Sequence, residues 1–566
     1  MKTQSQFNWY RLCKAGFSND DRTPMMTTRI QHAIVGALLI AAAASCAPRA
    51  STAPTPAPVP APHPVPVIPM ILRAPLPEAN PALPAVPSVS GPLAIKVIYP
   101  SSGQLIQSKD SNFIFGSVGT GEAGLTINGI PAPVWPNGAF MAWLPNPSAD
   151  SPRYDIVATT GFDTARISLP VKIQPAPAVP PLPADTIQLL ASAAYASLIG
   201  PPAYASDTDR VITGYALTGG IQRWFLMPNT VVKVTATRGS SDYVQLDSAQ
   251  TIRIDKSDLK LFDSVYVPVA RRVSAFRLKD YGQWTDVIIP ITEKPAYLVE
   301  EGPSSATLVL YGTKAPARKQ RPFKAPSASY IKLATASVDG PQMRYTLDLK
   351  GPVYGYQVLW QEGSLTFRVR RPPAVDSISP LMGLTIAVDP GHPPVGATGP
   401  TGLWEPVATL AVGFKVQELL QAKGVKVIMT RTSPEPVDLN LRPAIARREN
   451  ADAFVSIHLN AVPDGQNPFR AQGTTTYHYY LHSAPLADSV QRAAVSHLSL
   501  RNVGVKRENF AVVRGTWMPS ILVEGAFIIM PDQEAALRTP EYQLQYAQGI
   551  VDGLENYFRG LAKQQR

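Results

Sequence analysis

An alternation of short apolar runs with segments of helical spacing, between residues 384 and 561, constrains the fold more than any other feature. The β-branched run from Leu384 to Val388 is typical of a buried strand. Trp404 to Ala422 repeats apolar residues at helical spacing, and Gly424 follows where a helix-ending glycine belongs. Strands that alternate with helices predict an α/β domain with a mostly parallel sheet covered by helices on both faces.

The remaining elements of this region continue the same pattern. Further strands are expected at Val425 to Met429, Ala453 to Ile457, Thr474 to Leu481, Phe510 to Val513 and Ser520 to Val523, and further helices at 439–449, 485–500 and 541–558. Ligands of such sheets bind outside the carboxyl ends of the strands. Polar residues that follow the strands are therefore the first candidates for a site.

Four polar residues lie where the expected elements would bring them to one edge. His392 follows the first strand, His458 and Glu524 follow two others, and Glu405 opens the long helix. Two imidazoles and a carboxylate supply the three protein ligands of an open catalytic zinc site, which leaves a fourth position for water.

The motifs around these residues resemble those of the zinc-dependent N-acetylmuramoyl-L-alanine amidases whose catalytic domain has an α/β sheet. They occur in this order: Asp389-Pro390-Gly391-His392, Glu405, Thr430-Arg431, Ser456-Ile457-His458-Leu459-Asn460 and Val523-Glu524-Gly525-Ala526-Phe527. The resemblance implies that peptidoglycan is the substrate. The bond cleaved would join the lactyl group of N-acetylmuramic acid to L-alanine, during cell-wall remodelling or daughter-cell separation.

The resemblance also implies a role for each site residue. His392, Glu405 and His458 would bind Zn²⁺, and Glu524 would be the catalytic glutamate. Zinc lowers the pKa of a bound water and polarises a carbonyl. Glu524 would take a proton from the water and pass it to the leaving amine.

Four further residues lie in or near the same motifs. Asp389 and Asn460 are candidates for orienting the ligands from behind, and structural duty is an equal alternative for both. For Arg431 and Arg442 the structural role is favoured.

The chain departs from the family pattern beside His392. Relatives commonly carry two glycines, an acidic residue and a glycine there, whereas this chain has Pro393-Pro394-Val395-Gly396. The prolines predict a stiffer loop with altered substrate contacts. Some relatives insert an inhibitory helix between the positions of His458 and Glu524, but the elements expected here leave no room for it. An open site, restrained by anchoring and accessory domains, is therefore expected.

Two other functions remain open from the residues alone. One is a zinc peptidase that cuts within the stem peptide, and the other is an inactive amidase-like scaffold of the envelope. The remaining histidines of the region, His478, His482 and His497, are expected in packing or surface roles, with His478 the candidate for substrate contact.

The amino-terminal residues predict export. Arg29 precedes an apolar run from Ala33 to Ala44, too short to span a membrane, and Ala43-Ala44-Ser45-Cys46 resembles a lipobox. Cleavage before Cys46 and its lipidation would anchor a lipoprotein in the periplasm or cell envelope. Ordinary signal cleavage and a retained membrane anchor are the alternatives, and Met25 or Met26 is an alternative start. The two cysteines, Cys13 and Cys46, provide no disulfide framework for the later domains.

Several small all-β domains are expected between this signal and the α/β domain. We expect these boundaries: 1–46 signal segment, 47–91 Pro/Ala-rich linker, 92–173 immunoglobulin-like β-sandwich, 174–186 Pro-rich linker, 187–264 SH3-like domain, 270–372 AMIN-like domain and 380–562 catalytic domain. In the SH3-like domain Trp224, Phe225 and Tyr243 would form either a binding groove or core, and core is favoured.

Charge separates the two ends of the chain. Residues 1–383 hold 35 basic against 25 acidic residues, whereas residues 384–561 hold 15 against 16. Five cations fall in one stretch, Lys314, Arg318, Lys319, Arg321 and Lys324, which would be a solvated loop or a contact with the envelope. An excess of positive charge suits an anionic surface. Nucleic acid is not expected because no basic stripe with interleaved aromatic residues occurs. Envelope or division proteins would be further partners.

Overall fold

The computed structural model describes residues 71, 73–173, 187–199, 212–218, 223–263, 265–316, 320–361 and 363–565. The predicted signal segment with Cys46, the second linker, most of the first linker, Arg318 and Lys319 lie outside the described residues. Among the residues described, no helix is long and apolar enough to cross a membrane.

A six-stranded sheet organises the carboxyl-terminal region. Its strands are β28 (Thr385–Pro390), β29 (Lys426–Met429), β30 (Ala453–Asn460), β31 (Thr474–His478), β32 (Asn502–Arg507) and β33 (Ser520–Phe527). Their order is β29-β28-β30-β33-β31-β32. Neighbouring strands run parallel except β31 and β33, which are antiparallel. The parallel pairs β28–β30 and β30–β33 bring the carboxyl ends of three strands to one edge.

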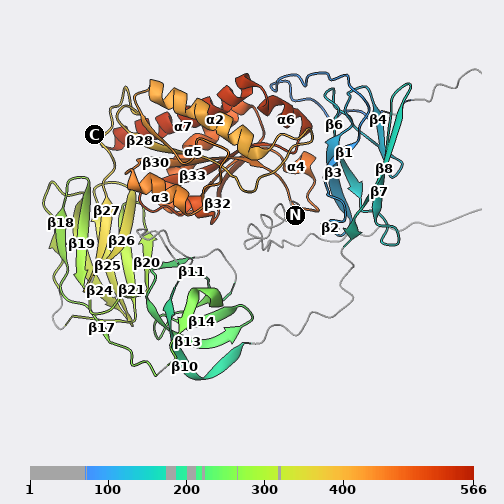
Figure 1. Ribbon diagram of the computed structural model, residues 1–566. Helices are drawn as coiled ribbons and strands as arrows, with labels where there is room; N and C mark the ends of the chain where they lie inside the picture. Colours follow the sequence, from blue (N-terminus) through green and yellow to red (C-terminus); the bar gives the residue numbers. More distant parts are fainter. Residues whose placement is uncertain are drawn as a thin grey trace, which may run out of the picture. The chain divides into compact units, whose positions relative to one another are not determined.

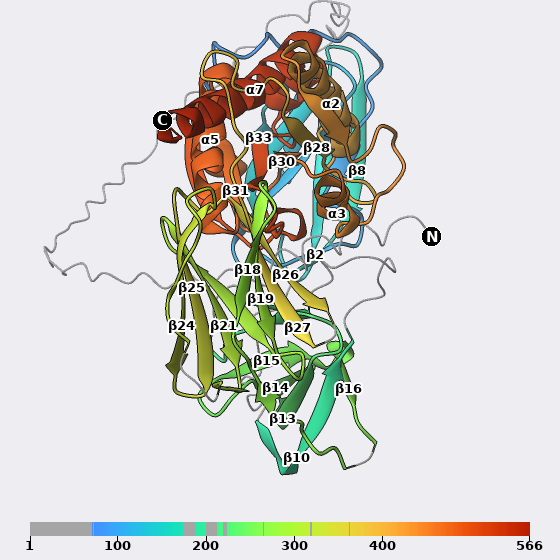
Figure 2. The ribbon, with the colours of Figure 1, turned by 90° about the vertical axis from the view of Figure 1, so that its left-hand side faces the viewer.

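Three long helices cover one face of this sheet. They are α2 (Glu405–Ala422), α5 (Ala484–Leu498) and α7 (Pro540–Gln564), and Figures 1 and 2 show them together on one side. Alternate strand residues such as Ile386 and Val388 pack into the core that these helices close. At Gly553 an added Cβ would lie 2.4 Å from Val490 Cα, so glycine permits the close packing of α7 on α5.

The opposite face is covered differently. The eight-residue helix α3 (Leu441–Arg448) lies on this side (Figure 1), and Ala446 of α3 joins one cluster with Val512 and Val513 of the 3₁₀ turn η4 (Ala511–Val513). Ala387, Phe454 and Leu522, which alternate with the residues of the first face, join a second cluster with Trp517 and with Phe225 from the preceding β-rich region. The helical cover of the two faces is therefore unequal.

One sequence prediction in this region is wrong, and three short elements were not predicted. Phe510 to Val513 was expected to be a strand, but residues 511–513 form η4, and the sheet instead uses the more polar β32. Apolar content alone predicts a strand here. Val512 and Val513 are buried as expected, but they are buried within a 3₁₀ turn, which does not need hydrogen bonds to a neighbouring strand. The short helices α4 (Pro468–Ala471) and α6 (Pro531–Leu537) and the turn η3 (Leu481–Ser483) were not expected at all.

The first β-rich region has two antiparallel sheets around one apolar core. One sheet is β1 (Lys96–Tyr99), β3 (Ser111–Ser117) and β6 (Ala139–Pro145), and the other is β4 (Gly124–Ile127), β5 (Ile130–Ala132), β7 (Arg153–Thr159) and β8 (Thr164–Pro170). β2 (Leu105–Ile106) pairs with β9 (Lys172–Ile173). The predicted turn at Asn128-Gly129 is confirmed, since both residues have positive φ and join β4 to β5.

The second β-rich region holds a five-stranded antiparallel sheet. Its strands are β10 (Gln188–Leu198), β13 (Val231–Arg238), β14 (Ser241–Gln245), β15 (Thr251–Asp255) and β16 (Leu259–Leu261), with η2 (Lys256–Asp258) before the last; β11 (Ile212–Gly214) pairs with β12 (Trp224–Leu226). Trp224, Phe225 and Tyr243 are all less than a tenth exposed, as the core interpretation predicts.

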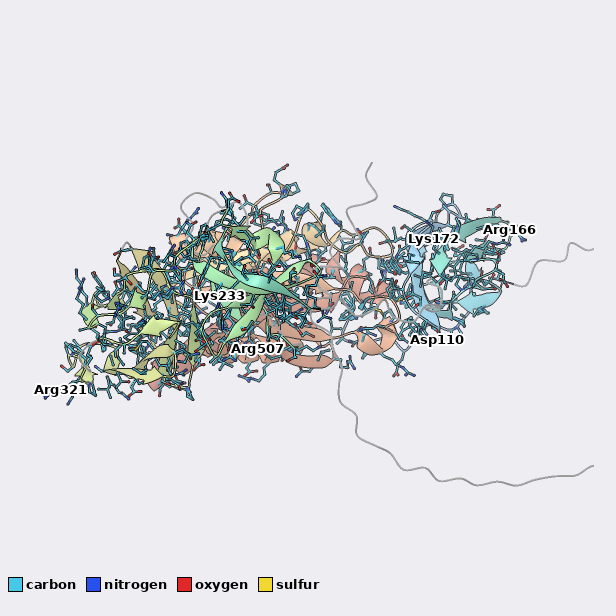
Figure 3. The ribbon with its side chains drawn as sticks, turned by 90° about the horizontal axis from the view of Figure 1, so that it is seen from below. Asp110, Arg166, Lys172, Lys233, Arg321 and Arg507 are labelled. Atoms are coloured by element: carbon cyan, nitrogen blue, oxygen red, sulfur yellow. The ribbon has the colours of Figure 1, made fainter. Side chains whose placement is uncertain are left out.

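The third β-rich region is built from two larger sheets around a shared core. One sheet consists of β18 (Arg277–Asp280), β19 (Trp284–Pro290), β26 (Gly355–Gln361) and β27 (Ser364–Arg370). The other consists of β20 (Tyr297–Glu301), β21 (Ser305–Tyr311), β23 (Phe323–Lys324), β24 (Ile331–Asp339) and β25 (Gln342–Leu349). A separate pair is formed by β17 (Arg271–Arg272) and β22 (Thr313–Lys314). Lys314, Arg321 and Lys324 are exposed, and Figure 3 shows Arg321 at the outer margin of the ribbon.

Candidate active site

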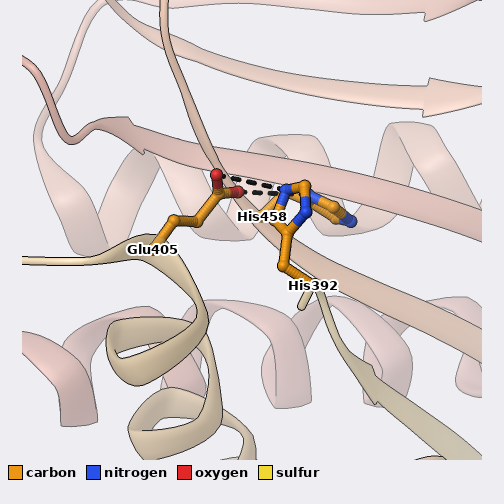
Figure 4. Close-up of side chains that lie close together, drawn as sticks. All are labelled: His392, Glu405 and His458. Carbon is orange, nitrogen blue, oxygen red and sulfur yellow. Dashed lines mark hydrogen bonds and ion pairs between the residues drawn. The ribbon is translucent and has the colours of Figure 1, made fainter. Parts of the chain in front are cut away.

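The structure brings the three predicted metal ligands together. His392 Nε2 lies 3.1 Å from Glu405 Oε2, and His458 Nδ1 lies 3.2 Å from Glu405 Oε1. Figure 4 shows the carboxylate facing both rings. One ligand atom from each residue lies within 4.8 Å of the others. All three side chains are buried, so the cluster is part of the folded interior rather than a chance surface contact.

Two buried arginines fix the backbone that carries His392. Arg442 donates to the carbonyl of His392 at 2.9 Å and to that of Pro390 at 3.0 Å. Arg431 donates to the carbonyls of Pro390 and Gly391 at 2.8 and 2.9 Å. His392 has φ +62°, a backbone conformation that L residues rarely adopt. Four donated hydrogen bonds to this turn hold the imidazole in place.

Asp389 acts on the turn that carries His392 indirectly, because Arg442 binds both Asp389 and the carbonyl of His392. Its carboxylate accepts from Arg442 Nη1 at 2.8 Å and from Ser456 Oγ at 2.7 Å, and it also accepts from Thr430 Oγ1. Burial raises the pKa of Asp389, but the charge of Arg442 and the two hydroxyl donors outweigh it, so the pKa lies below its usual value. An ionised Asp389 therefore anchors the arginine that holds the turn at His392.

Glu405 is the first residue of α2 and is surrounded by donors. Its carboxylate accepts the backbone N–H of Ala397 at 2.9 Å and that of Leu459 at 3.0 Å. Burial raises the pKa of Glu405, but the charges and hydrogen bonds of His392 and His458 lower it by more than burial raises it. The net pKa is therefore well below the usual value. Glu405 is accordingly held as a carboxylate with both oxygens directed to the two rings.

Glu524 lies beside this cluster in the opposite electrostatic setting. It stands directly across from His458 in the parallel ladder of β30 and β33. Its Oε2 is buried and has no hydrogen-bond partner among the described residues. Burial, and then the charge of Glu405, raise the pKa of Glu524 well above its usual value. Such a carboxyl group keeps its proton to a higher pH than an exposed glutamate does.

The donor set fits a divalent metal of the zinc type. Imidazole nitrogen and carboxylate oxygen are zinc donors, and three protein ligands are the usual number for a catalytic site. A cation there would also offset the repulsion between the carboxyl groups of Glu405 and Glu524. The residues present therefore fit the metal that the sequence predicted.

The other residues considered from the sequence, Asn460 and the three remaining histidines of this region, are not part of the cluster of His392, Glu405 and His458. Asn460 is half-buried and its carbonyl accepts from Ile528 N at 3.2 Å, so its role in orienting a ligand stays a prediction. His478 contacts the carbonyl of Tyr480 at 3.0 Å, and His482 and His497 pair with Glu301 and Asp552 at 2.9 and 2.8 Å. These contacts fit packing and surface roles rather than metal binding.

Two residues that contact the site's backbone were missed from the sequence. Glu534 on α6 is fully buried and accepts the N–H groups of Thr401 and Leu403, both at 2.9 Å, in the segment that leads to Glu405. Tyr546 on α7 places its hydroxyl beside the backbone of His458. Tyr546 falls in a helix that the sequence predicts, whereas the helix of Glu534 was not predicted, and helical spacing does not reveal which loop a side chain reaches.

Comparison with known proteins gives matches to parts of this chain. A family model described as N-acetylmuramoyl-L-alanine amidase matches residues 386–556. The uncharacterised protein YqiI of Bacillus subtilis is 33% identical over 209 residues, which are 36% of this chain and 98% of YqiI. The N-acetylmuramoyl-L-alanine amidase LytC of B. subtilis is 35% identical over 187 residues, which are 32% of this chain and 37% of LytC.

A solved structure also matches part of this chain. The N-acetylmuramoyl-L-alanine amidase AmiC2 of Nostoc punctiforme has 35% sequence identity with a TM-score of 0.29, and the match covers 31% of this chain and 96% of that one. The family model thus matches the carboxyl-terminal third of the chain.

Proposed function

Because the chain belongs to the N-acetylmuramoyl-L-alanine amidase family, we propose that it is a zinc-dependent hydrolase of peptidoglycan. The scissile bond is the amide between the lactyl group of N-acetylmuramic acid and L-alanine of the stem peptide. The observation that carries the proposal is the buried group of His392, Glu405 and His458, with Glu524 on the neighbouring strand.

His392, Glu405 and His458 would hold the zinc. When bound, zinc lowers the pKa of water and polarises a carbonyl, as a Lewis acid does. Glu405 remains ionised among its donors and balances part of the metal's charge. Arg431 and Arg442 keep the turn at His392 from moving.

Glu524 is the proton carrier in this proposal. Its carboxylate takes a proton from the attacking water as the oxygen bonds to the lactyl carbonyl carbon. The same group then gives the proton to the nitrogen of L-alanine as the carbon–nitrogen bond breaks. The products are a free lactyl carboxylate on the sugar and an intact stem peptide with a free amine. The raised pKa of Glu524 supports this role because the group can hold the proton between the two steps.

The location and anchoring belong to the same proposal. Peptidoglycan lies outside the cytoplasm, so the enzyme would act in the periplasm or cell envelope. Lipidated Cys46 would hold it to a membrane, and the β-rich regions, proposed as immunoglobulin-like, SH3-like and AMIN-like domains, would position it on the wall. A Cys46→Ser chain that stays membrane-bound and incorporates lipid as before would contradict the anchor.

Digestion of purified peptidoglycan tests the activity. The chain without residues 1–46 is incubated with sacculi, and soluble products are identified by mass spectrometry. The amidase predicts intact stem peptides beginning with L-alanine and glycans with free lactyl groups. Shortened peptides would identify a zinc peptidase instead. Binding without release of products, by protein that holds about one zinc, would identify a scaffold.

A further inference from the structure

The hydroxyl of Tyr546 lies between the two strands that carry His458 and Glu524. Tyr546 is on α7 and its side chain is fully buried. Its hydroxyl oxygen lies 2.9 Å from Gly525 N, 2.8 Å from Val523 O and 3.1 Å from His458 O. The hydroxyl accepts from the N–H of Gly525 and donates to Val523 O, with His458 O close enough to share the proton.

These contacts enclose the backbone of Glu524. Val523 O belongs to the peptide group before Glu524, and Gly525 N belongs to the peptide group after it. One hydroxyl therefore binds both peptide groups that fix the position and direction of the Glu524 side chain. The contact with His458 O ties the same point to the strand of a metal ligand.

Strand pairing alone does not supply this constraint. His458 and Glu524 are opposite each other in the ladder of β30 and β33, but the register shifts between His458 and Asn460. After His458 and Glu524, the regular ladder of hydrogen bonds that would set the distance between β30 and β33 is interrupted. The Tyr546 hydroxyl supplies hydrogen bonds at the point where the ladder becomes irregular.

The local sequence makes room for the tyrosine ring. A Cβ added at Gly525 would lie 2.2 Å from Tyr546 Cζ, so only glycine lets the ring lie against the backbone there.

We propose that Tyr546 is a positioning residue that fixes Glu524 relative to His458 through the backbone of both strands. This inference rests on the proposed function, in which Glu524 moves a proton beside the metal ligands. Small displacements of a reacting group are costly, since a shift of about 1 Å can reduce a rate about 100-fold. Loss of the hydroxyl would thus reduce turnover while the ligands still bind metal.

A purely structural hydroxyl is the competing explanation, and Tyr542 offers a matched control. Tyr542 lies one turn earlier on α7 and is also fully buried. Its hydroxyl contacts the carbonyl of Leu498 at 3.4 Å, at the end of α5. Tyr542→Phe and Tyr546→Phe each remove one buried oxygen from the same helix, but only the second touches the backbone of the site.

The experiment compares the full chain with these two variants after zinc loading. Zinc content, thermal unfolding, and kcat and KM on soluble peptidoglycan fragments are measured for each. Both variants are expected to hold as much zinc as the wild type and to unfold at similar temperatures. We expect kcat of Tyr546→Phe to fall about 10-fold or more with KM nearly unchanged, while Tyr542→Phe keeps kcat within about twofold.

A second readout does not depend on turnover. With Co²⁺ in place of zinc, the visible absorption spectrum of Tyr546→Phe should shift from that of the wild type, because the strand of His458 is released. The spectrum of Tyr542→Phe should not shift.

Equal kcat values in the two variants would overturn the inference. So would a Tyr546→Phe chain that fails to fold while Tyr542→Phe folds, because the hydroxyl would then serve stability alone. Wild-type chain that binds zinc but releases no product would overturn the proposed function and the inference with it, and this outcome is distinct from the other two.

Discussion

Glu405 and Glu524 are both glutamates buried in the same site, but the groups around their carboxyl groups differ. The Glu405 carboxylate meets two imidazoles and two backbone N–H groups. Glu524 has a buried oxygen without a hydrogen-bond partner among the described residues. The pKa of Glu405 is lowered by its partners, and the pKa of Glu524 is raised by burial and by Glu405.

The difference shows how one residue type can serve two chemical purposes. Donors that surround a carboxylate keep it ionised, which suits a metal ligand. A dry environment beside another negative charge favours the protonated form, which suits a proton carrier. Four predictions, one of them with its own control substitution, test the site, and they are ordered by the size of the expected effect.

Replacement of the ligand should have the largest effect. Glu405→Gln keeps the size of the side chain but removes the charge and one acceptor oxygen. We expect the variant to lose zinc during purification and its hydrolase activity to fall to background. Metal analysis and peptidoglycan digestion on the same sample measure both effects. Full zinc content in this variant would show that Glu405 is not a ligand.

Replacement of the proton carrier should separate activity from metal binding. Glu524→Gln is expected to lose activity by about 100- to 10,000-fold, the usual contribution of a general base or acid. Zinc content should match that of the wild type, since Glu524 is not a ligand in this account. Near-normal activity in the variant would contradict its role as proton carrier.

Glu534 tests whether the position of Glu405 depends on the loop before it. The carboxylate of Glu534 holds the N–H groups of Thr401 and Leu403, so Glu534→Gln should loosen the segment that leads to Glu405. Zinc affinity is expected to weaken by about 10- to 100-fold, the range seen when a group behind a ligand is replaced.

Asp452 provides the control for that prediction. It accepts the N–H of Thr385 at 2.9 Å, at the opposite end of β28 from the metal ligands. Asp452→Asn should reduce stability without changing zinc affinity, which competition with a coloured chelator measures. Equal affinity loss in both variants would indicate a general effect of lower stability.

The smallest effect concerns pH and the buried carboxylate of Asp389. Its folded-state pKa is lowered, so the stability it contributes is present above about pH 4, the unfolded value, and is lost as pH falls through the folded value. Asp389→Asn should therefore melt several degrees below the wild type at pH 7, and the difference should narrow toward pH 3. A constant difference across this range would show that Asp389 is not ionised in the fold.

The sequence predicted the elements that carry the site because their signals are local. The apolar run ending at Val388 corresponds to β28, and the spacing from Trp404 to Ala422 corresponds to α2. His392, Glu405 and His458 stood at the ends of such elements, and the structure brings them together as a possible metal site. The family resemblance supplied the chemistry that spacing could not.

Other features depend on contacts that no local pattern reveals. Phe510 to Val513 is as apolar as a strand, but tertiary packing makes it a turn. The roles of Glu534 and Tyr546 depend on which distant backbone groups their side chains reach. The assignment of the β-rich regions to particular domain families stays a prediction, because short alternating strands are shared by many β folds.

Anomalous diffraction at the zinc absorption edge, from crystals of the zinc-loaded wild-type chain, tests the division between the two glutamates most directly. The account predicts one strong peak, about 2.0 to 2.2 Å from a nitrogen of His392, a nitrogen of His458 and an oxygen of Glu405. Glu524 should lie outside this coordination shell. A peak bound by Glu524, or the absence of a peak among the three predicted ligands, would contradict the account.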